Sequence, residues 1–254
     1  MGAGPEPAST SADGVGARRL PPAQRIPTRT GETSRSGELP GGWRVPFARE
    51  GMPYIAGTGI ATAVLLLAGW VWLGAVAALL TAFTLNFFRD PERSADAGPT
   101  AVIAPADGRV IKAERVQDDR FLNGPANQVS IFMSPLDVHV NRNPMDGRVT
   151  DIRYHPGKYF RAFADKASLD NEQNAIVLED PRGRRVAFVQ IAGFIARRIV
   201  CYLRPGMEAT RGARCGMIMF GSRVDVFLPI ESRVNVTVGA RTRAGETVIA
   251  EWTT

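Results

Sequence analysis

The chain has 254 residues and a formal net charge of +6, and only three of its 31 basic residues are lysines. This balance favours acidic partners, such as anionic lipid, nucleic acid or an acidic substrate, without choosing among them. The only two cysteines, Cys201 and Cys215, exclude a disulfide framework and a cysteine-based metal cluster, so we expect two reduced thiols.

Residues 1–45 are rich in Gly, Pro, Ser, Thr, Ala and Arg and contain few large apolar residues. Such a segment cannot bury enough apolar surface to offset the entropy that it would lose on ordering. We therefore predict a disordered N-terminal tail. It has no apolar stretch of the kind that defines a signal peptide.

Residues 51–88 form a run of 38 residues without a charged side chain. The run exceeds the roughly 20 residues needed for one membrane span and is slightly short for two spans with a turn. A Gly- and Trp-rich break, GWVWLG at 69–74, divides it. We predict a membrane-associated apolar helical hairpin within 46–93, or one span plus an interfacial helix. A helical pair buried in a soluble core is the alternative.

Arginines flank the apolar run on both sides, namely Arg44, Arg49, Arg89 and Arg93. By the positive-inside tendency both ends of the run stay cytoplasmic, which favours the hairpin. Arg89 and Arg93 follow the run directly. Two interpretations of this second pair stay open, contact with anionic lipid or a topology signal alone.

Residues 94–254 change to short β-rich runs separated by turns, which predict a mainly β domain built as an antiparallel sandwich or barrel. A short helix is expected near 158–169. The expected strands lie at 101–116, 127–134, 147–155, 174–180, 185–193, 199–203, 224–229 and 233–239, followed by a hairpin-like unit at 240–252.

The stretch CGMIMFGSRVDVFLP at 215–229 reads as one apolar strand-like run interrupted by Gly221 and Ser222. After the interruption the alternation places Val224, Val226 and Leu228 on one face and Arg223, Asp225 and Phe227 on the other. Glycine weakens a strand, so this pair on its own predicts a bulge.

Standard catalytic and metal-binding templates do not occur in the chain. Its two histidines, His139 and His155, lie outside any cluster with metal-ligand spacing, so no metal is expected. Gly-x-Ser-x-Gly, P-loop and dinucleotide-binding motifs are absent. The arginines are scattered and lack interleaved aromatic residues, so no nucleic-acid partner is expected.

Four motifs occur in a characteristic order: PADG at 105–108, SPLDVHVNRNPMDG at 134–147, YHPGKYF at 154–160 and FGSRVDVFLP at 220–229. With the apolar run and FFRDPER at 87–93, this order resembles the short form of the phosphatidylserine decarboxylase family. The resemblance covers roughly Pro46 to Trp252.

The resemblance implies a proenzyme that cuts itself between Gly221 and Ser222 and converts Ser222 into a pyruvoyl group, its covalent cofactor. The products would be two chains, 1–221 and 222–254, held together by β-pairing as a heterodimer. Further dimerisation of this heterodimer stays open. It also implies His139 as the base, supported by Asp107 or Asp137, because a free serine hydroxyl is a poor nucleophile.

By the same resemblance, the pyruvoyl ketone would form a Schiff base with phosphatidylserine and release phosphatidylethanolamine, with His139 as proton donor. Longer relatives carry a second histidine where this chain has Arg142. His155 as its substitute, or His139 in both steps, stays open. The expected location is the cytoplasmic face of the cell membrane, where the domain is peripheral or hairpin-anchored and meets its lipid substrate.

Two other functions stay open. The same chemistry could act on another serine-headgroup lipid of the archaetidylserine type, since the sequence does not report on the lipid tails. A non-enzymatic biotinyl- or lipoyl-like module would need a lysine at a hairpin tip. Lys166 comes nearest, within a predicted helix.

Overall fold

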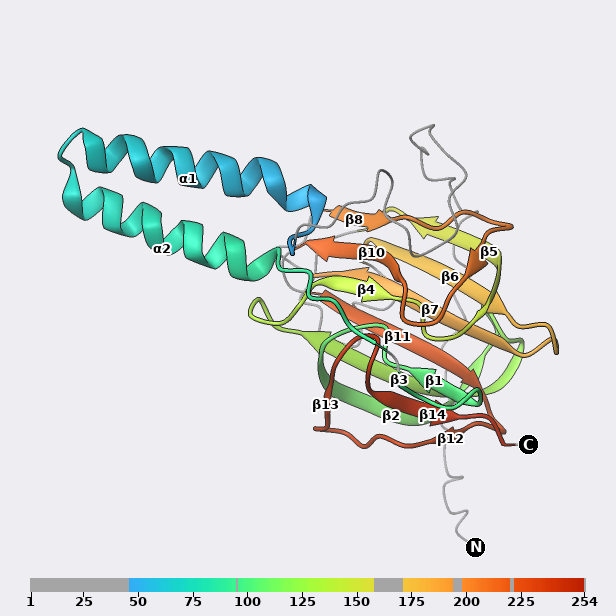
Figure 1. Ribbon diagram of the computed structural model, residues 1–254. Helices are drawn as coiled ribbons and strands as arrows, with labels where there is room; N and C mark the ends of the chain where they lie inside the picture. Colours follow the sequence, from blue (N-terminus) through green and yellow to red (C-terminus); the bar gives the residue numbers. More distant parts are fainter. Residues whose placement is uncertain (1–45, 95, 158–170, 194–197, 220–221, 254) are drawn as a thin grey trace, which may run out of the picture.

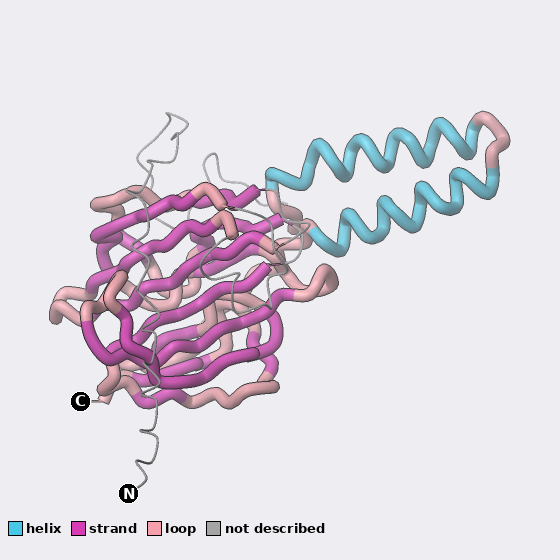
Figure 2. The backbone as a smooth tube through the Cα atoms, turned by 180° about the vertical axis from the view of Figure 1, so that it is seen from behind, coloured by secondary structure: helices cyan, strands magenta, loops and turns pink. Residues whose placement is uncertain are grey.

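The computed structural model describes residues 46–94, 96–157, 171–193, 198–219 and 222–253, and Figure 1 shows a helical hairpin projecting from a β-rich body. The predicted tail at 1–45 and the predicted helix near 158–169 lie outside these residues. The body is mainly antiparallel β, as predicted, and Figure 2 shows its largest sheet curling around the interior.

A short 3-10 helix, η1 (Arg49–Gly51), precedes the hairpin of α1 (Met52–Leu67) and α2 (Val71–Phe87). At 1.5 Å per residue these helices are about 24 and 26 Å long, shorter than the roughly 30 Å bilayer core. Gly69, with φ of +79°, turns the chain between them. The Thr62 and Thr81 hydroxyls meet at 3.0 Å between the helices. We call α1, α2 and this turn the apolar hairpin.

The apolar hairpin exposes large apolar side chains along its length. The most exposed are Leu67 and Trp72, at 89% and 87%. Residues Arg49–Leu67 are long and apolar enough to cross a membrane, with a mean hydropathy of 1.3, whereas Val71–Phe87 is shorter. The alternative of a helical pair buried in a soluble core is wrong for this chain, because α1 has no buried residue and α2 has only Gly74, Thr84 and Phe87.

The described strands form one large and two small sheets, all antiparallel. The large sheet has the order β13 (Arg241–Thr242), β2 (Gly108–Asp118), β3 (Gly124–Met133), β11 (Ser222–Pro229), β7 (Arg185–Ala192), β6 (Gln173–Glu179), β5 (Gly147–His155) and β9 (Glu208–Ala209). One small sheet has the order β4 (Val140–Arg142), β10 (Arg214–Met219) and β8 (Arg198–Cys201). The other has the order β1 (Ala101–Ile103), β14 (Val248–Glu251) and β12 (Arg233–Val234).

The run at 215–229 is two strands in two sheets rather than one bulged strand. β10 pairs with β4 and β8, whereas β11 lies between β3 and β7 in the large sheet. The chain therefore leaves one sheet at Met219 and enters another at Ser222. The prediction of one continuous strand is wrong, because β10 and β11 have different partners, and the predicted bulge falls on Gly221, which lies outside the described residues.

The alternation predicted for β11 is confirmed. Val224, Val226 and Leu228 join the main core, and Phe227 joins a second apolar cluster on the opposite face. On that opposite face Arg223 Nε donates to Asp225 Oδ1 at 2.5 Å. Both faces are buried, so β11 is a central strand.

The predicted hairpin at 240–252 is also wrong. β13 pairs with β2, whereas β14 pairs with β1 and β12, so the two segments belong to different sheets. β4, β9 and β10 were not predicted as separate strands. They are short or continue an apolar run, and they gain their hydrogen bonds from partners distant in the sequence.

Candidate active site

Ser222 is the first residue of β11, where the chain has just left the small sheet. Its register partners are Met133 in β3 and Ala192 in β7. The residue is completely buried, and its Oγ has no hydrogen-bond partner among the described residues. A buried hydroxyl without a hydrogen-bond partner destabilises the folded chain, so a hydroxyl kept at this position indicates a role other than stability.

His139 lies directly before β4 and is completely buried. Its Nδ1 is 2.8 Å from the backbone oxygen of Asp137. A carbonyl oxygen can only accept, so Nδ1 carries the hydrogen and Nε2 carries the lone pair. Nε2 has no hydrogen-bond partner among the described residues. The imidazole is therefore oriented as a base with a free acceptor atom.

Burial keeps His139 neutral. It lowers the pKa of the imidazole to about 4, although the backbone bond to Asp137 and the charges of Asp137 and Asp107 act in the opposite direction. At neutral pH the ring is therefore able to accept a proton. Part of this burial comes from Phe87, the last residue of α2, whose ring centroid is 4.1 Å from that of the imidazole.

Asp107 lies directly before β2 and is held in an ion pair. Arg93 donates to both of its carboxylate oxygens, and the backbone N–H of Ala244 donates to Oδ1 at 2.7 Å. Gly108, the first residue of β2, has a φ of +143° and lies close to the backbone of β3. A Cβ at this position would collide with the Phe132 carbonyl, so only glycine allows the two strands to approach here. The carboxylate is thus committed to Arg93 and Ala244. The Arg93 side chain is only 4% exposed, so it is not a lipid contact in this chain.

Asp137, the other predicted partner of His139, also directs its carboxylate elsewhere. One oxygen accepts from the Ser134 amide at 2.8 Å and from its hydroxyl at 2.7 Å. Arg241 lies 3.5 Å from the other oxygen. Only the backbone of Asp137 contacts the imidazole, so the structure contains no hydrogen bond between a carboxylate and His139 within its described residues.

Arg142 joins the segment after the apolar hairpin to the β-rich body. It donates to the carbonyl oxygens of Pro91 and Gly212, at 2.8 Å each, and lies 3.5 Å from Asp90. Asp90 in turn accepts from Arg214 at 2.6 Å, at the start of β10. Arg142 is therefore a buried structural cation.

His155 ends β5, which is separated from β11 by β6 and β7. Its register partner in β6 is Gln173, and Gln173 in turn pairs with Ile191 in β7. Ile191 pairs with Arg223, the residue after Ser222 in β11. Three strand spacings amount to about 14 Å. Met219, three residues before Ser222, packs in one apolar cluster with Phe87, Val138 and Val140, the last two on either side of His139. His139 and the start of β11 therefore lie at the end of the body that carries the hairpin, and His155 lies apart.

Three buried amides near Ser222 escaped the sequence analysis. Gln190 Nε2 donates to Asn141 Oδ1, and Asn174 Nδ2 donates to Gln190 Oε1, at 2.9 Å each. Asn141 belongs to the HVNR motif, and Gln190 is an amide inside the apolar run VAFVQIAG. A polar residue in a run expected to be buried was the available signal for Gln190.

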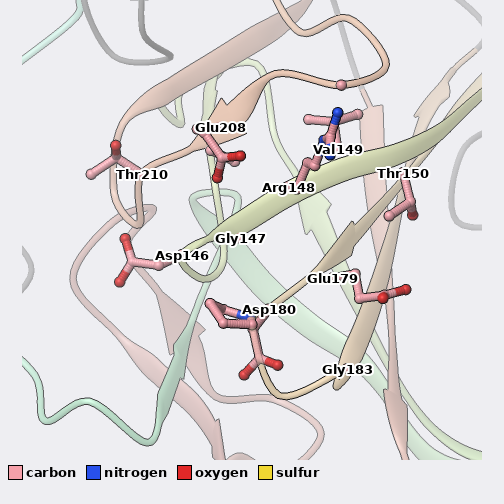
Figure 3. Close-up of a pocket in the computed structure, with 13 residues that line it drawn as sticks. Asp146, Gly147, Arg148, Val149, Thr150, Glu179, Asp180, Gly183, Glu208 and Thr210 are labelled. Atoms are coloured by element: carbon pink, nitrogen blue, oxygen red, sulfur yellow. The ribbon is translucent and has the colours of Figure 1, made fainter.

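A pocket of about 950 Å³ lies elsewhere, around the start of β5 and the end of β6. Figure 3 shows Asp146, Glu179, Asp180 and Glu208 around it, with Arg148 beside them. None of the predicted site residues lines this pocket. Among the residues that the structure describes, no group of His, Cys, Asp and Glu is arranged to hold a metal ion.

The fold and the site define a β-rich domain with a buried hydroxyl and a neutral imidazole at the base of an apolar hairpin, an arrangement suited to nucleophilic chemistry. The family model described as phosphatidylserine decarboxylase matches residues 80–250. The chain therefore belongs to the phosphatidylserine decarboxylase family, which is a family of decarboxylases.

Similar curated proteins carry the name phosphatidylserine decarboxylase proenzyme. The protein of Ralstonia pickettii (strain 12J) is 48% identical over 208 residues, covering 81% of this chain and 95% of the relative. That of Desulfotalea psychrophila is 46% identical over 208 residues, covering 82% and 97%. That of Nitrosomonas europaea is 48% identical over 207 residues, covering 81% and 95%.

Proposed function

We propose that this chain is a proenzyme that cuts itself between Gly221 and Ser222 and then decarboxylates phosphatidylserine to phosphatidylethanolamine. The observation that carries the proposal is the pair of buried polar atoms without described partners, Ser222 Oγ and His139 Nε2. The names of the relatives support the same substrate and the proenzyme state.

In the first step His139 Nε2 takes the proton of Ser222 Oγ, and the oxygen adds to the carbonyl carbon of Gly221. The C–N bond breaks, an ester forms, and the proton passes to the departing nitrogen. Loss of the Cα proton of residue 222 then breaks the ester C–O bond, which leaves the carboxylate of Gly221 as the end of the longer chain and a dehydroalanine at the start of the shorter one. This enamine tautomerises to an imine, and hydrolysis by one water releases ammonia and leaves a ketone. A glycine before the serine does not crowd the attacked carbonyl, because it has no Cβ.

The site fits the pyruvoyl group that would result. Ser222 is buried between two strands, and its hydroxyl is not committed to another group among the described residues. This ketone would supply an electron sink, since it forms a Schiff base with the substrate amine. His139 would hold and return the proton at the reacting carbon, while Phe87 keeps water from the imidazole.

The two chains produced by cleavage would remain together as a heterodimer. Residues 222–254 contribute β11, and this strand is hydrogen-bonded to β3 and β7 on both sides. Further dimerisation of this heterodimer stays a prediction. The pairing supports retention of the short chain without a covalent link.

The proposed location is the cytoplasmic face of the cell membrane, with the apolar hairpin inserted. Supporting observations are the exposed apolar side chains of α1 and α2 and the packing of Phe87 and Phe88 against Val138 and Val140 next to the site. A diacyl lipid stays in the bilayer, so a site at the base of the hairpin can meet its head group there.

Intact mass spectrometry of the purified protein tests the proposal. Wild type should give two chains, with the shorter one blocked at its N-terminus and trappable by hydroxylamine. Ser222→Ala should give one uncut, inactive chain. Ser232→Ala is a matched control, because Ser232 is also buried with an unpartnered Oγ among the described residues; it should be cut like wild type.

Two results would refute the proposal. Normal cutting of Ser222→Ala would exclude the site, and decarboxylation by an uncut wild-type chain would exclude the mechanism. Assays with phosphatidylserine and with free serine address the substrate separately. Equal turnover of the two would contradict a lipid substrate.

A further inference from the structure

A row of three buried amides crosses the interior beside Ser222. It consists of Asn174 in β6, Gln190 in β7 and Asn141 in β4, all completely buried. Asn174 donates to Gln190 and Gln190 donates to Asn141, at 2.9 Å each. Buried amides cost free energy even when well paired, and an apolar row of the same shape would be about as stable.

The contact with Met133 sets the direction of the hydrogen bonds along the row. Asn141 Nδ2 is 3.7 Å from the Met133 Sδ, and a thioether can only accept a hydrogen bond. Asn141 therefore turns its NH2 group towards Met133 and its Oδ1 towards Gln190. Gln190 must then donate to Asn141 and accept from Asn174, as the structure has it.

The NH2 end of the row lies at the start of β11. Met133 is the register partner of Ser222, and directly opposed residues in an antiparallel pair point to one face with Cβ atoms about 4.5–5.5 Å apart. Gln190 lies on the same face, two residues before Ala192, the other partner of Ser222. Gly216 leaves room for the amide, since a Cβ there would be 3.1 Å from Gln190 Nε2.

Asn141 has unused donor capacity at this place. Its NH2 group carries two hydrogens, and the only acceptor that it meets among the described residues is the weakly accepting sulfur of Met133. His139, the proposed base, lies two residues earlier in the chain. The proposed base and a donor with spare capacity are thus two residues apart in the chain, and the donor contacts Met133, the residue paired with Ser222.

We propose that Asn141 Nδ2 donates a hydrogen bond to the oxyanion that forms during self-cleavage, and that Gln190 and Asn174 are positioning residues that hold it. This inference rests on the proposed function. When Ser222 Oγ adds to the carbonyl carbon bonded to the Ser222 nitrogen, the carbonyl oxygen becomes negative. The charge leaves again when the C–N bond breaks, so the donor is not consumed. Removing one such donor slows related reactions by about 10²–10³-fold.

The first test measures the rate of self-cleavage of newly made chain in Asn141→Asp, which keeps the shape and the acceptor towards Gln190. Its second carboxylate oxygen would replace the donor Nδ2 and would carry no hydrogen. The expected result is a loss of about 100-fold or more in rate. Asn143→Asp is the matched control, because Asn143 is equally buried but donates to the Thr210 carbonyl; its folded chain should be cut at the wild-type rate.

The second test is the pH profile of cutting in Gln190→Glu, which leaves Asn141 intact. A protonated carboxyl can donate to Asn141 Oδ1, and an ionised one cannot. Burial raises carboxyl pKa values, so cutting should be near the wild-type rate at low pH and fall as pH rises through the carboxyl pKa. Wild type should lack this fall. Ionisable groups nearby among the described residues include His139, the Cys201 thiol, which contacts Asn174, and the Cys215 thiol next to Gly216; all are present in wild type.

Cutting of both variants at the wild-type rate at every pH would overturn the inference and leave the proposed function intact. A wild-type chain that is not cut at Ser222 would refute the proposed function instead. Thermal unfolding of each variant in a Ser222→Ala background reports whether it folds. If Asn141→Asp does not fold, the pH profile of Gln190→Glu decides alone.

Discussion

The imidazole of His139 packs against the phenyl ring of Phe87, with ring centroids 4.1 Å apart and planes inclined by 32°. Phe87 is the last residue of the apolar hairpin, and His139 is the proposed base. The element expected to enter the membrane therefore also covers the base.

This contact predicts that Phe87→Ala changes the pH dependence of self-cleavage. Removing the ring lets water reach His139, so its pKa should rise from about 4 towards 6.5. The base acts only when neutral, so the pH below which cutting slows should rise by about one unit or more. The rate of cutting measured from pH 4 to 8 checks this.

Phe83→Ala is the matched control for Phe87→Ala. Phe83 packs on Phe87, with ring centroids 6.1 Å apart, whereas the ring that packs on His139 is that of Phe87. Its profile should stay close to that of wild type. Equal shifts in both variants would show that general loosening of the hairpin, rather than hydration of the imidazole, is responsible.

The buried imidazole also predicts a pH-dependent stability. The folded pKa of His139, about 4, lies below the unfolded value of 6.5, so the unfolded chain binds more protons between these values. The contribution of the neutral imidazole to the free energy of unfolding is complete above pH 6.5. It is lost as pH falls towards 4, by up to about 3 kcal/mol. We expect the free energy of unfolding, measured with denaturant, to fall more steeply with decreasing pH in Ser222→Ala than in Ser222→Ala/His139→Gln. The same dependence on pH in both variants would contradict a buried neutral imidazole.

The Arg93–Asp107 pair predicts a large cost when one partner is removed. Arg93→Ala would leave a carboxylate that is only 12% exposed without its cation, and such losses cost about 3–5 kcal/mol. Denaturant unfolding in the Ser222→Ala background measures the change. Arg233→Ala is the control, because its pair with Glu251 is 68% and 37% exposed, and exposed pairs contribute about 1 kcal/mol or less. A similar small loss for both would contradict a structural role of Asp107.

The exposed apolar side chains of the hairpin predict membrane binding. The double variant Leu67→Asp/Trp72→Asp places two charges where the hairpin would enter hydrocarbon, at about 2.5–3.5 kcal/mol each on insertion scales. Flotation with phosphatidylserine-containing vesicles should show strongly reduced binding. Val238→Asp, at an apolar residue that is 63% exposed in the β-rich body, should bind like wild type. Undiminished binding of the double variant would exclude the hairpin as the anchor.

Local pattern predicted much of the fold. The uncharged run with its Gly- and Trp-rich break predicted the helical hairpin, and the alternation after Ser222 assigned both faces of β11. These predictions succeeded because helix length and strand alternation depend on neighbouring residues. The change of sheets before Ser222 was missed, since it depends on the strands that pair with β10 and β11.

The same distinction applies to the site. The ordered motifs predicted Ser222, His139 and Asp107 as site residues, which stays a prediction, and did not predict the partners of Asp107. Its carboxylate is bound by Arg93, 14 residues earlier, and by Ala244, 137 residues later. No spacing rule relates these positions.

By itself, the amino-acid sequence determined the kind of protein: an apolar hairpin, a β-rich body, and a family whose motifs surround a Gly-Ser pair. The tertiary structure alone decided which groups surround the serine. It paired Arg93 with Asp107, covered His139 with Phe87, and joined Asn141 to Gln190 across 49 residues. The physical reason is that motifs and periodicity are properties of neighbouring residues, whereas burial and hydrogen bonding depend on how distant strands pack in the folded chain.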